Sequence, residues 1–334
     1  MIDAAKLRRV LAALLGLAVS PLFFAACSAE GPSPVATSGA TSDVTSGATS
    51  AGASSAVATS LVISDAGADV DAADAAPDEA LPGKTEGCPE GMVLVEGSYC
   101  PDALQKCAAH HEEYNKDEKR KRAKRVAGED VNASTVSERC LRYVSPSVCR
   151  SKERRQMRFC MDRYEWPNQK GELPALLVSW VSAKKQCEAI GKRLCTENEF
   201  NFACEGEEML PYTYGFERDP TKCNIDKPYR KRERKLFTYE RCMKDERCKA
   251  ELKKLDQRVG AGTMPACVSP FGVYDLNGNI NEWVVRPNQS PPNRSGLKGG
   301  WWGPVRGRCR PTVGYHKEED YGYEEGFRCC ADAR

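Results

Sequence analysis

The distribution of cysteines constrains this chain more than any other feature of its sequence. The 334 residues include 17 cysteines, of which sixteen lie between Cys88 and Cys330 while Cys27 stands apart. No Cys-x-x-Cys pair occurs and the chain has 3 histidines, so the pattern differs from that of a structural zinc site. An even number of clustered cysteines is typical of a disulfide framework in an oxidising compartment. We therefore predict an exported domain with up to eight disulfides, which is half of sixteen.

The first 27 residues have the pattern of a secretory signal. The basic start Lys6–Arg9 precedes the apolar run Val10–Ala26, which is short for a membrane span of about 20 residues. Small residues then come before Cys27, and this order resembles a bacterial lipobox. In that interpretation Cys27 is acylated and anchors the protein to the outer membrane, facing the periplasm or the surface, because Ser28 is not an acidic retention signal. In the alternative, the signal is cleaved and Cys27 is incidental.

Residues 28–86 form a low-complexity segment of Ala, Ser, Thr and Gly, with Asp in its second half. Phe, Trp and Tyr are absent from it. Such a segment cannot bury enough apolar surface to offset the entropy of its chain. We predict a flexible tether over residues 28–86 that holds an ordered domain, residues 88–334, away from a membrane.

Several runs within residues 88–334 predict regular elements. Gly91–Gly97 has an apolar core between two glycines, and Phe159–Glu165 has a similar composition, so both predict strands. Ser182–Ile190 predicts a helix with Ala183, Cys187 and Ile190 on one face.

A second helix is predicted to begin after Thr196 and to continue through Cys204, because Thr196 and Glu199 have the spacing of a capping box. The last block, Met264–Arg334, is rich in Gly, Trp and Asn. We expect loops and short strands there.

Two charged insertions are predicted, at about residues 107–156 and 227–258. In the first, residues 116–125 hold seven basic and two acidic side chains, and we expect a helical insertion. The second holds 13 Lys or Arg and 6 Asp or Glu. The cysteines expected to pin the two insertions are Cys107, Cys140, Cys149, Cys242 and Cys248.

Two interpretations of these basic insertions stay open. In the first, the insertions bind an anionic lipid or an acidic glycan. In the second, they are solvated helices whose charges maintain solubility. A nucleic-acid partner is not expected for an exported chain without a known nucleic-acid-binding motif.

Several sequence blocks, taken in order, resemble the formylglycine-generating enzyme (sulfatase-modifying factor) family. The resemblance covers Cys88 to the C-terminus and implies an irregular α+β fold related to C-type lectins, with little regular secondary structure. One departure is Cys195, where the family usually has Pro. The blocks are Gly91–Gly97, Val178–Trp180, Gly191–Phe200, Pro211–Gly215, Cys223–Asn224, Phe271–Trp283, Lys298–Gly300 and Gly326–Cys329.

Active members of that family use oxygen to convert a sulfatase cysteine to formylglycine, with Cu(I) held by two thiolates. The position of the first thiol is Pro304 here, so that thiol is missing. Counting forward from Gly300 puts Cys309 on the second thiol, whereas counting backward from Gly326–Cys329 puts it on a structural cysteine. We follow the backward count and predict a non-catalytic binding or structural module. An oxidase that uses Cys309 is the alternative.

The resemblance also implies disulfide partners. Two pairs follow from the family, and a third, parallel bridge is expected from the two added cysteines. These expected pairs are Cys187–Cys329, Cys204–Cys309 and Cys195–Cys330.

The block Phe271–Trp283 is the one that the family uses for a structural Ca²⁺, and oxygen ligands at short spacing suit that ion. The alternative is a metal-free loop closed by its own Asx turns. A second family site uses Asn224 and Ile225, but its remaining ligands would fall in the basic insertion. The expected ligands of the first site are the side chain of Asp275 and the carbonyls of Leu276, Gly278 and Ile280.

His316 lies near the family's substrate groove, and we expect either a ligand contact or an ordinary surface histidine. Four aromatic residues of the last block are expected either to form a binding surface or to belong to the core. They are Trp301, Trp302, Tyr321 and Tyr323.

Overall fold

The computed structural model describes residues 83–128, 137–233 and 244–334. The predicted signal with Cys27, the predicted tether as far as residue 82, and Cys242 lie outside the described residues. Within the described segments, no helix combines the length and the apolar character that a membrane crossing requires. The helices and strands are β1 (Met92–Tyr99), β2 (Ala103–Leu104), β3 (Cys107–His110), α1 (Glu112–Val126), β4 (Cys140–Tyr143), β5 (Val148–Cys149), β6 (Arg155–Asp162), α2 (Trp180–Ala189), β7 (Arg193–Leu194), α3 (Glu197–Glu205), α5 (Glu246–Leu255), β8 (Asn281–Val285), β9 (Ser295–Lys298), β10 (Glu325–Gly326) and β11 (Cys329–Asp332).

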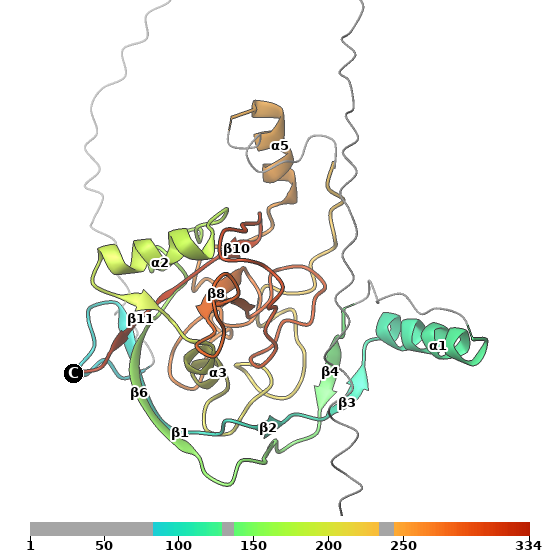
Figure 1. Ribbon diagram of the computed structural model, residues 1–334, viewed down its shortest axis with the longest axis horizontal. Coiled ribbons are helices and arrows are strands. Elements are labelled where there is room, and N and C mark those ends of the chain that lie inside the picture. Colours follow the sequence, from blue (N-terminus) through green and yellow to red (C-terminus); the bar gives the residue numbers. More distant parts are fainter. Residues whose placement is uncertain (1–82, 129–136, 234–243) are drawn as a thin grey trace, which may run out of the picture. The chain divides into compact units, whose positions relative to one another are not determined.

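The largest sheet has the strand order β1-β6-β11-β7. β1 and β6 are antiparallel, with Met92 opposite Asp162 and Tyr99 opposite Arg155. β11, which ends close to the C-terminus, pairs with both β6 and β7. Figure 1 shows these strands along one side of the domain. The first and last strands of the domain therefore belong to one sheet, so the chain must fold almost completely before this sheet is complete.

The strand predicted over Phe159–Glu165 is shifted in the structure, where β6 begins at Arg155 and ends at Asp162. Beyond Asp162 the chain turns, because the amide of Tyr164 donates to Asn168 Oδ1 at 2.9 Å. This turn removes Arg163–Glu165 from the sheet.

α3 begins where the capping box predicted it. Thr196 accepts from the amide of Glu199, and the Glu199 carboxylate accepts from the amide of Thr196. The helix buries Phe200 and Phe202 in the main core, together with Val93 and Val95 of β1. Local capping and apolar burial thus act together at this helix.

α2 is capped by Ser179, whose side chain accepts from the amide of Ser182. It buries Trp180, Ala183 and Cys187 in a second cluster. The prediction that Ile190 shares this face was wrong, because the helix ends at Ala189 and Ile190 is 50% exposed.

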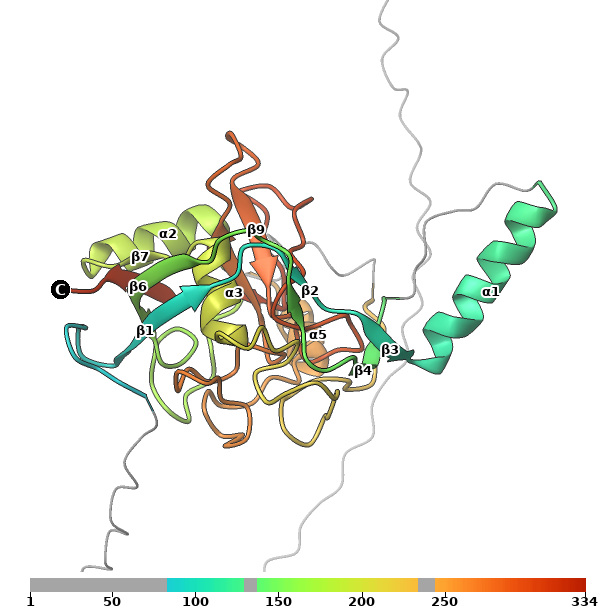
Figure 2. The ribbon, with the colours of Figure 1, turned by 90° about the horizontal axis from the view of Figure 1, so that it is seen from below.

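The first insertion, expected to be helical, combines α1 with the strand pair β3·β4, and its strand β5 pairs with β2, which precedes the insertion. Figures 1 and 2 both show α1 extending away from the body of the domain. α1 has no apolar face, and its buried residue is Asp117. In the second insertion, α5 buries Cys248 and Leu255.

The last block contains short strands and loops, as predicted. β8 lies between β9, which is antiparallel to it, and β10, which is parallel. The α+β architecture with little regular secondary structure and many disulfides is confirmed.

Candidate functional site

The disulfides determine what chemistry the described cysteines can perform. Every cysteine in the described part of the chain is disulfide-bonded. The six cysteines for which partners were expected from the sequence are joined as Cys187–Cys329, Cys195–Cys330 and Cys204–Cys309.

Four further disulfides join partners that sequence reasoning did not assign. Cys149 is bonded to a residue before the first insertion, so it does not close the insertion on itself, whereas Cys107 and Cys140 do. Cys248 is also disulfide-bonded. The four bonds are Cys88–Cys160, Cys100–Cys149, Cys107–Cys140 and Cys223–Cys267.

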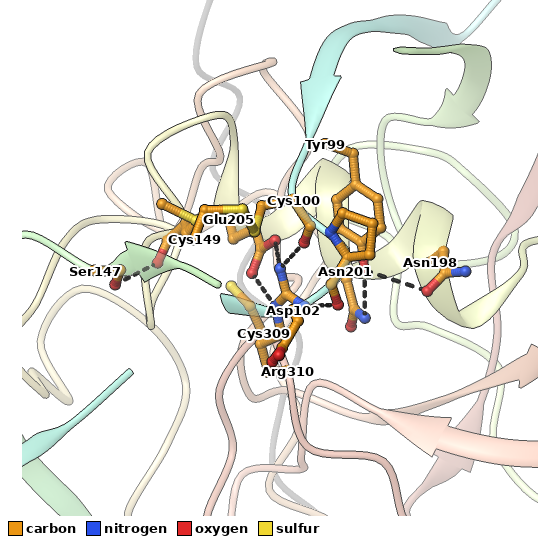
Figure 3. Close-up of polar contacts among 12 residues, drawn as sticks. Tyr99, Cys100, Asp102, Ser147, Cys149, Asn198, Asn201, Glu205, Cys309 and Arg310 are labelled. Atoms are coloured by element: carbon orange, nitrogen blue, oxygen red, sulfur yellow. Dashed lines mark hydrogen bonds and ion pairs between the residues drawn. A yellow bond between two sulfur atoms is a disulfide. The ribbon is translucent and has the colours of Figure 1, made fainter. Parts of the chain in front are cut away.

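Cys309 is fully buried and lies beside an ion pair between Arg310 and the buried Glu205, which Figure 3 shows. Its neighbour Arg310 donates from Nε to Glu205 Oε2 at 2.6 Å, and Glu205 follows Cys204, the partner of Cys309. The Arg310 guanidinium also donates to the carbonyl of Cys100. Burial raises the pKa of Glu205 to about 7, although the guanidinium opposes this. The surroundings of Cys309 are those of a packed structural disulfide.

Lys298 is buried next to this network. Its Nζ lies 2.6 Å from Asn201 Oδ1, 2.7 Å from the carbonyl of Arg310 and 3.3 Å from Thr312 Oγ1. Burial lowers the pKa of Lys298 to about 7, against the attraction of nearby carboxylates. The amine is fully hydrogen-bonded by protein groups, which indicates a structural role.

The residues at the two expected copper positions do not suit Cu(I). That ion needs thiolates. Pro304 has no thiol, and the sulfur of Cys309 is already bonded to Cys204. The copper-dependent interpretation therefore has no ligand pair at these positions.

A cavity of about 570 Å³ lies beside Gly300. We call it the Trp301 cavity. Asn281 of β8 and Leu297 of β9 line it from the core, and Glu118 of α1 lines it from the insertion. The first insertion thus adds a wall to a cavity built on the family's Gly-Gly block. A second cavity of about 500 Å³, beside Pro304, shares the Trp301 wall.

His316 lines the Trp301 cavity and is partly buried. Its Nδ1 lies 3.7 Å from Glu325 Oε1 and 3.8 Å from Asp320 Oδ2. Burial lowers the pKa of His316. The prediction left a ligand contact and a surface position open, and the structure places this histidine in a cavity wall.

Three of the four aromatic residues lie in the core or in the cavity wall, and the fourth, Tyr321, belongs to neither. Trp302 is 0% exposed and Tyr323 is buried, in one cluster with Ile280. Trp301 packs against that cluster and also lines the cavity. A continuous four-residue aromatic surface is therefore not formed.

The loop over the expected calcium ligands has the backbone of a tight turn. Asp275, Gly278 and Asn279 all have positive φ angles. Asp275 Oδ2 accepts from the amide of Gly262 at 2.6 Å, whereas its buried Oδ1 has no hydrogen-bond partner. Oε1 of the buried Glu165 likewise has none. Such unsatisfied buried acceptors are suited to a hard cation.

The charges around this loop are unbalanced. Arg328 donates from Nε to Glu282 Oε2 at 2.6 Å, and both are buried. Burial raises the pKa of Glu165 well above its usual value, and the carboxylates of Asp275 and Glu282 add to this effect. Within the described segments, no group of three or more His, Cys, Asp or Glu is arranged to hold a metal ion. A site here would depend on carbonyl oxygens for most of its ligands.

The two residues at the second family calcium position, Asn224 and Ile225, have protein groups around them. Asn224 donates from Nδ2 to Asn279 Oδ1 at 3.0 Å and to the carbonyl of Gln257, while its own Oδ1 has no partner. Ile225 is buried in a small cluster with the Cys223–Cys267 disulfide. These residues connect the loop Asp275–Ile280 to the second insertion.

The family model for FGE-sulfatase, the sulfatase-modifying factor enzyme 1-like domain, matches residues 93–333. Inactive C-alpha-formylglycine-generating enzyme 2 of Bos taurus and that of Mus musculus are each 27% identical over 179 residues, which is 49% of this chain. The matches cover 52% and 51% of those relatives, so the chain spans about half of their length.

Two solved structures are similar over most of their own length. CarF has a TM-score of 0.40 at 12% identity, covering 61% of this chain and 96% of CarF. PvdO from Pseudomonas aeruginosa has a TM-score of 0.39 at 16% identity, covering 75% of this chain and 98% of PvdO. Because the family model extends over most of the chain, this protein belongs to the sulfatase-modifying factor enzyme 1-like domain family.

Proposed function

We propose that this protein is a non-catalytic binding module built on the sulfatase-modifying factor scaffold. The observation that carries the proposal is the Cys204–Cys309 disulfide, together with Pro304 at the first thiol position. A formylglycine-generating oxidase of this family needs two thiolates for Cu(I), and these positions supply none. Two relatives are themselves called inactive, which supports the same conclusion.

The binding role is supported by the Trp301 cavity. Its volume of about 570 Å³ lies within the range of small-molecule sites. Aromatic, cationic and acidic side chains all reach it, so its wall offers stacking and polar contacts at once. The insertion helix α1 contributes Tyr114 and Glu118 to the lining, so one wall of the cavity comes from the first insertion.

We place the module outside the cytoplasm, held at the bacterial outer membrane by a lipid on Cys27. The seven disulfides that join pairs of described cysteines are typical of an exported protein. The exposed basic residues in the second half of α1 are suited to an anionic lipid or glycan surface. We also propose a structural Ca²⁺ held by Asp275 and the carbonyls of the following loop.

The test of the non-catalytic assignment counts thiols and measures Cu(I) binding. The protein is unfolded without reductant and titrated with a thiol reagent, and Cu(I) binding is measured on the folded protein. We expect no pair of reactive thiols and no tight copper binding. The variant Cys204→Ser serves as a control, because it releases one countable thiol at Cys309.

The competing oxidase function predicts a different result. Two reactive thiols, tight Cu(I) binding and conversion of a cysteine-containing sulfatase peptide to an aldehyde would together overturn the proposal. Aldehyde formation is followed with a hydrazide probe, so activity and copper binding are measured independently.

A further inference from the structure

The charges of α1 are separated along the helix. All four acidic residues of the helix lie in its first half, which ends at Glu118. From Lys119 to Arg125, six of the seven side chains are Lys or Arg, and the seventh is Ala123. We call Lys119–Val126 the distal half of α1. It contains neither an acidic nor an aromatic residue, so one half of the helix is acidic and the other is strongly basic.

The first half of α1 attaches the helix to the domain. Glu113 is ion-paired with Arg139, which is 6% exposed. The ring of Tyr114 stacks on that of His110 in β3, with 4.8 Å between their centroids. A disulfide joins β3 to β4 at the base of the insertion. The helix is therefore held at its base, and Figures 1 and 2 show it projecting from the body of the domain.

Three cations of the distal half are not neutralised by the protein. Lys119, Arg122 and Arg125 are exposed, and none of them has a hydrogen bond or ion pair within the described part of the chain. Their spacing of three residues places them on one side of the helix. Three basic residues of α5, by contrast, have acidic partners. These pairs are Arg247–Asp245, Lys249–Glu246 and Lys254–Glu251.

The surroundings of these cations fit a membrane better than a glycan. None of Lys119, Arg122 and Arg125 lines the Trp301 cavity or the cavity beside Pro304, so they do not surround a shaped ligand. Val126, at the end of the helix, is 84% exposed. An apolar side chain next to cations is suited to the boundary between lipid headgroups and acyl chains. An acidic glycan has no apolar layer for Val126 to enter.

We propose that the distal half of α1 docks on an anionic phospholipid membrane, where Lys119, Arg122 and Arg125 contact the headgroup phosphates and Val126 enters the headgroup layer. The inference rests on the proposed location at a membrane and names the partner of the basic surface. Anionic leaflets attract clusters of Lys and Arg through their surface potential. The contact adds to the lipid proposed on Cys27 and turns the α1 side of the domain toward the bilayer.

The experiment measures binding to vesicles without an acyl chain. It uses the mature chain, residues 27–334, with Cys27→Ser, which contains every helix and strand of the described segments. Co-sedimentation compares vesicles of phosphatidylcholine with vesicles in which about one third of the lipid is phosphatidylglycerol. We expect binding to the phosphatidylglycerol vesicles alone. It should be lost between about 0.1 M and about 1 M NaCl, because the Debye length falls from about 10 Å to about 3 Å.

The test variant combines Lys119→Gln, Arg122→Gln and Arg125→Gln. Each cation near an anionic leaflet changes the partition coefficient about fivefold, so the loss of three should reduce binding to the phosphatidylglycerol vesicles about a hundredfold. Circular dichroism melts establish that the variant is folded. The comparison of lipids and salt on the parent chain does not depend on any of these substitutions.

The matched control combines Lys152→Gln, Lys170→Gln and Lys185→Gln, which removes the same net charge at exposed positions outside the two insertion helices. It should bind at least tenfold more tightly than the test variant. Equal binding of the parent to both kinds of vesicle, or equal losses in the two triple variants, would overturn the inference. Retention on heparin without binding to phosphatidylglycerol would also overturn it, in favour of an acidic glycan. The thiol and copper measurements are unaffected by these results, so the two proposals fail separately.

Discussion

Lys298 places an amine inside the core, and its titration makes the free energy of unfolding depend on pH. The pKa of Lys298 is lowered from 10.5 to about 7 by burial. Between these two values the unfolded chain binds more protons than the folded one, so the free energy of unfolding rises with pH by about 1.4 kcal/mol per unit. Below about pH 7 this residue is charged in both states and adds no slope. We expect Lys298→Met to lack this rise.

The measurement is urea denaturation of both proteins at pH 7.5, 8.5 and 9.5. Glu324 and Glu325 titrate near the lower end of this window, but they are the same in both proteins and cancel in the difference. Lys185→Met, at an exposed position of α2, should leave the slope unchanged. An identical pH slope in the wild type and Lys298→Met would show that the buried amine is charged throughout.

For single residues, the sequence predicted disulfide partners where the family has a matching position, and it did not predict them elsewhere. Cys204 and Cys309 are joined as the family comparison implied, whereas the bond between Cys100 and Cys149 had no family counterpart to suggest it. The burial of Glu325 was missed for another reason. Glu325 follows a run of charged residues that is typical of a surface, and its burial depends on packing against segments far away in sequence.

Among the elements, local signals predicted α3 well and the ends of other elements less well. The capping box at Thr196 acts within one turn, so its effect does not depend on distant contacts. β6, by contrast, ends where Asn168 closes a turn, and the composition of Phe159–Glu165 contains no sign of this. The strands within the first insertion could not be predicted, because β3 and β4 pair across an intervening helix.

The loop Asp275–Ile280 yields a prediction at the scale of elements. If it holds Ca²⁺, adding the ion to chelator-treated protein should raise the melting temperature. An ion present at 100 times its Kd stabilises by about 2.7 kcal/mol, or roughly 5–10 °C for a domain of this size. Differential scanning fluorimetry with calcium and EDTA measures this change.

The matched variant is Asp275→Asn, which tolerates the positive φ of this position but removes its charge. It should shift the calcium titration to higher concentrations. Asp102→Asn, at an exposed ion pair with Arg150, should not. If neither calcium nor EDTA changes the melting temperature of the wild type, the loop is a metal-free turn.

On the scale of the whole molecule, the disulfides connect the ends of the domain. Cys88 is bonded to Cys160 in β6, and Cys329 and Cys330 connect β11 to α2 and to the residue after β7. The longest of these bonds close loops of more than 100 residues, and a loop of that size is worth about 4.7 kcal/mol in the chain-entropy model. Disulfides persist only in an oxidising compartment, so this contribution to stability requires that the domain is exported.

The position of Cys27 gives the final prediction, which concerns how the domain is held in place. A lipid on this cysteine would put the whole protein in the detergent phase of a Triton X-114 separation, because each buried CH₂ of an acyl chain contributes about 0.8 kcal/mol. Cys27→Ser should move the protein to the aqueous phase, and Ser28→Ala should leave it with the detergent. Non-reducing electrophoresis of both variants establishes that the disulfides have formed. If Cys27→Ser partitions with the membrane as the wild type does, Cys27 is not the anchor, and membrane attachment must be sought in the basic surface of α1.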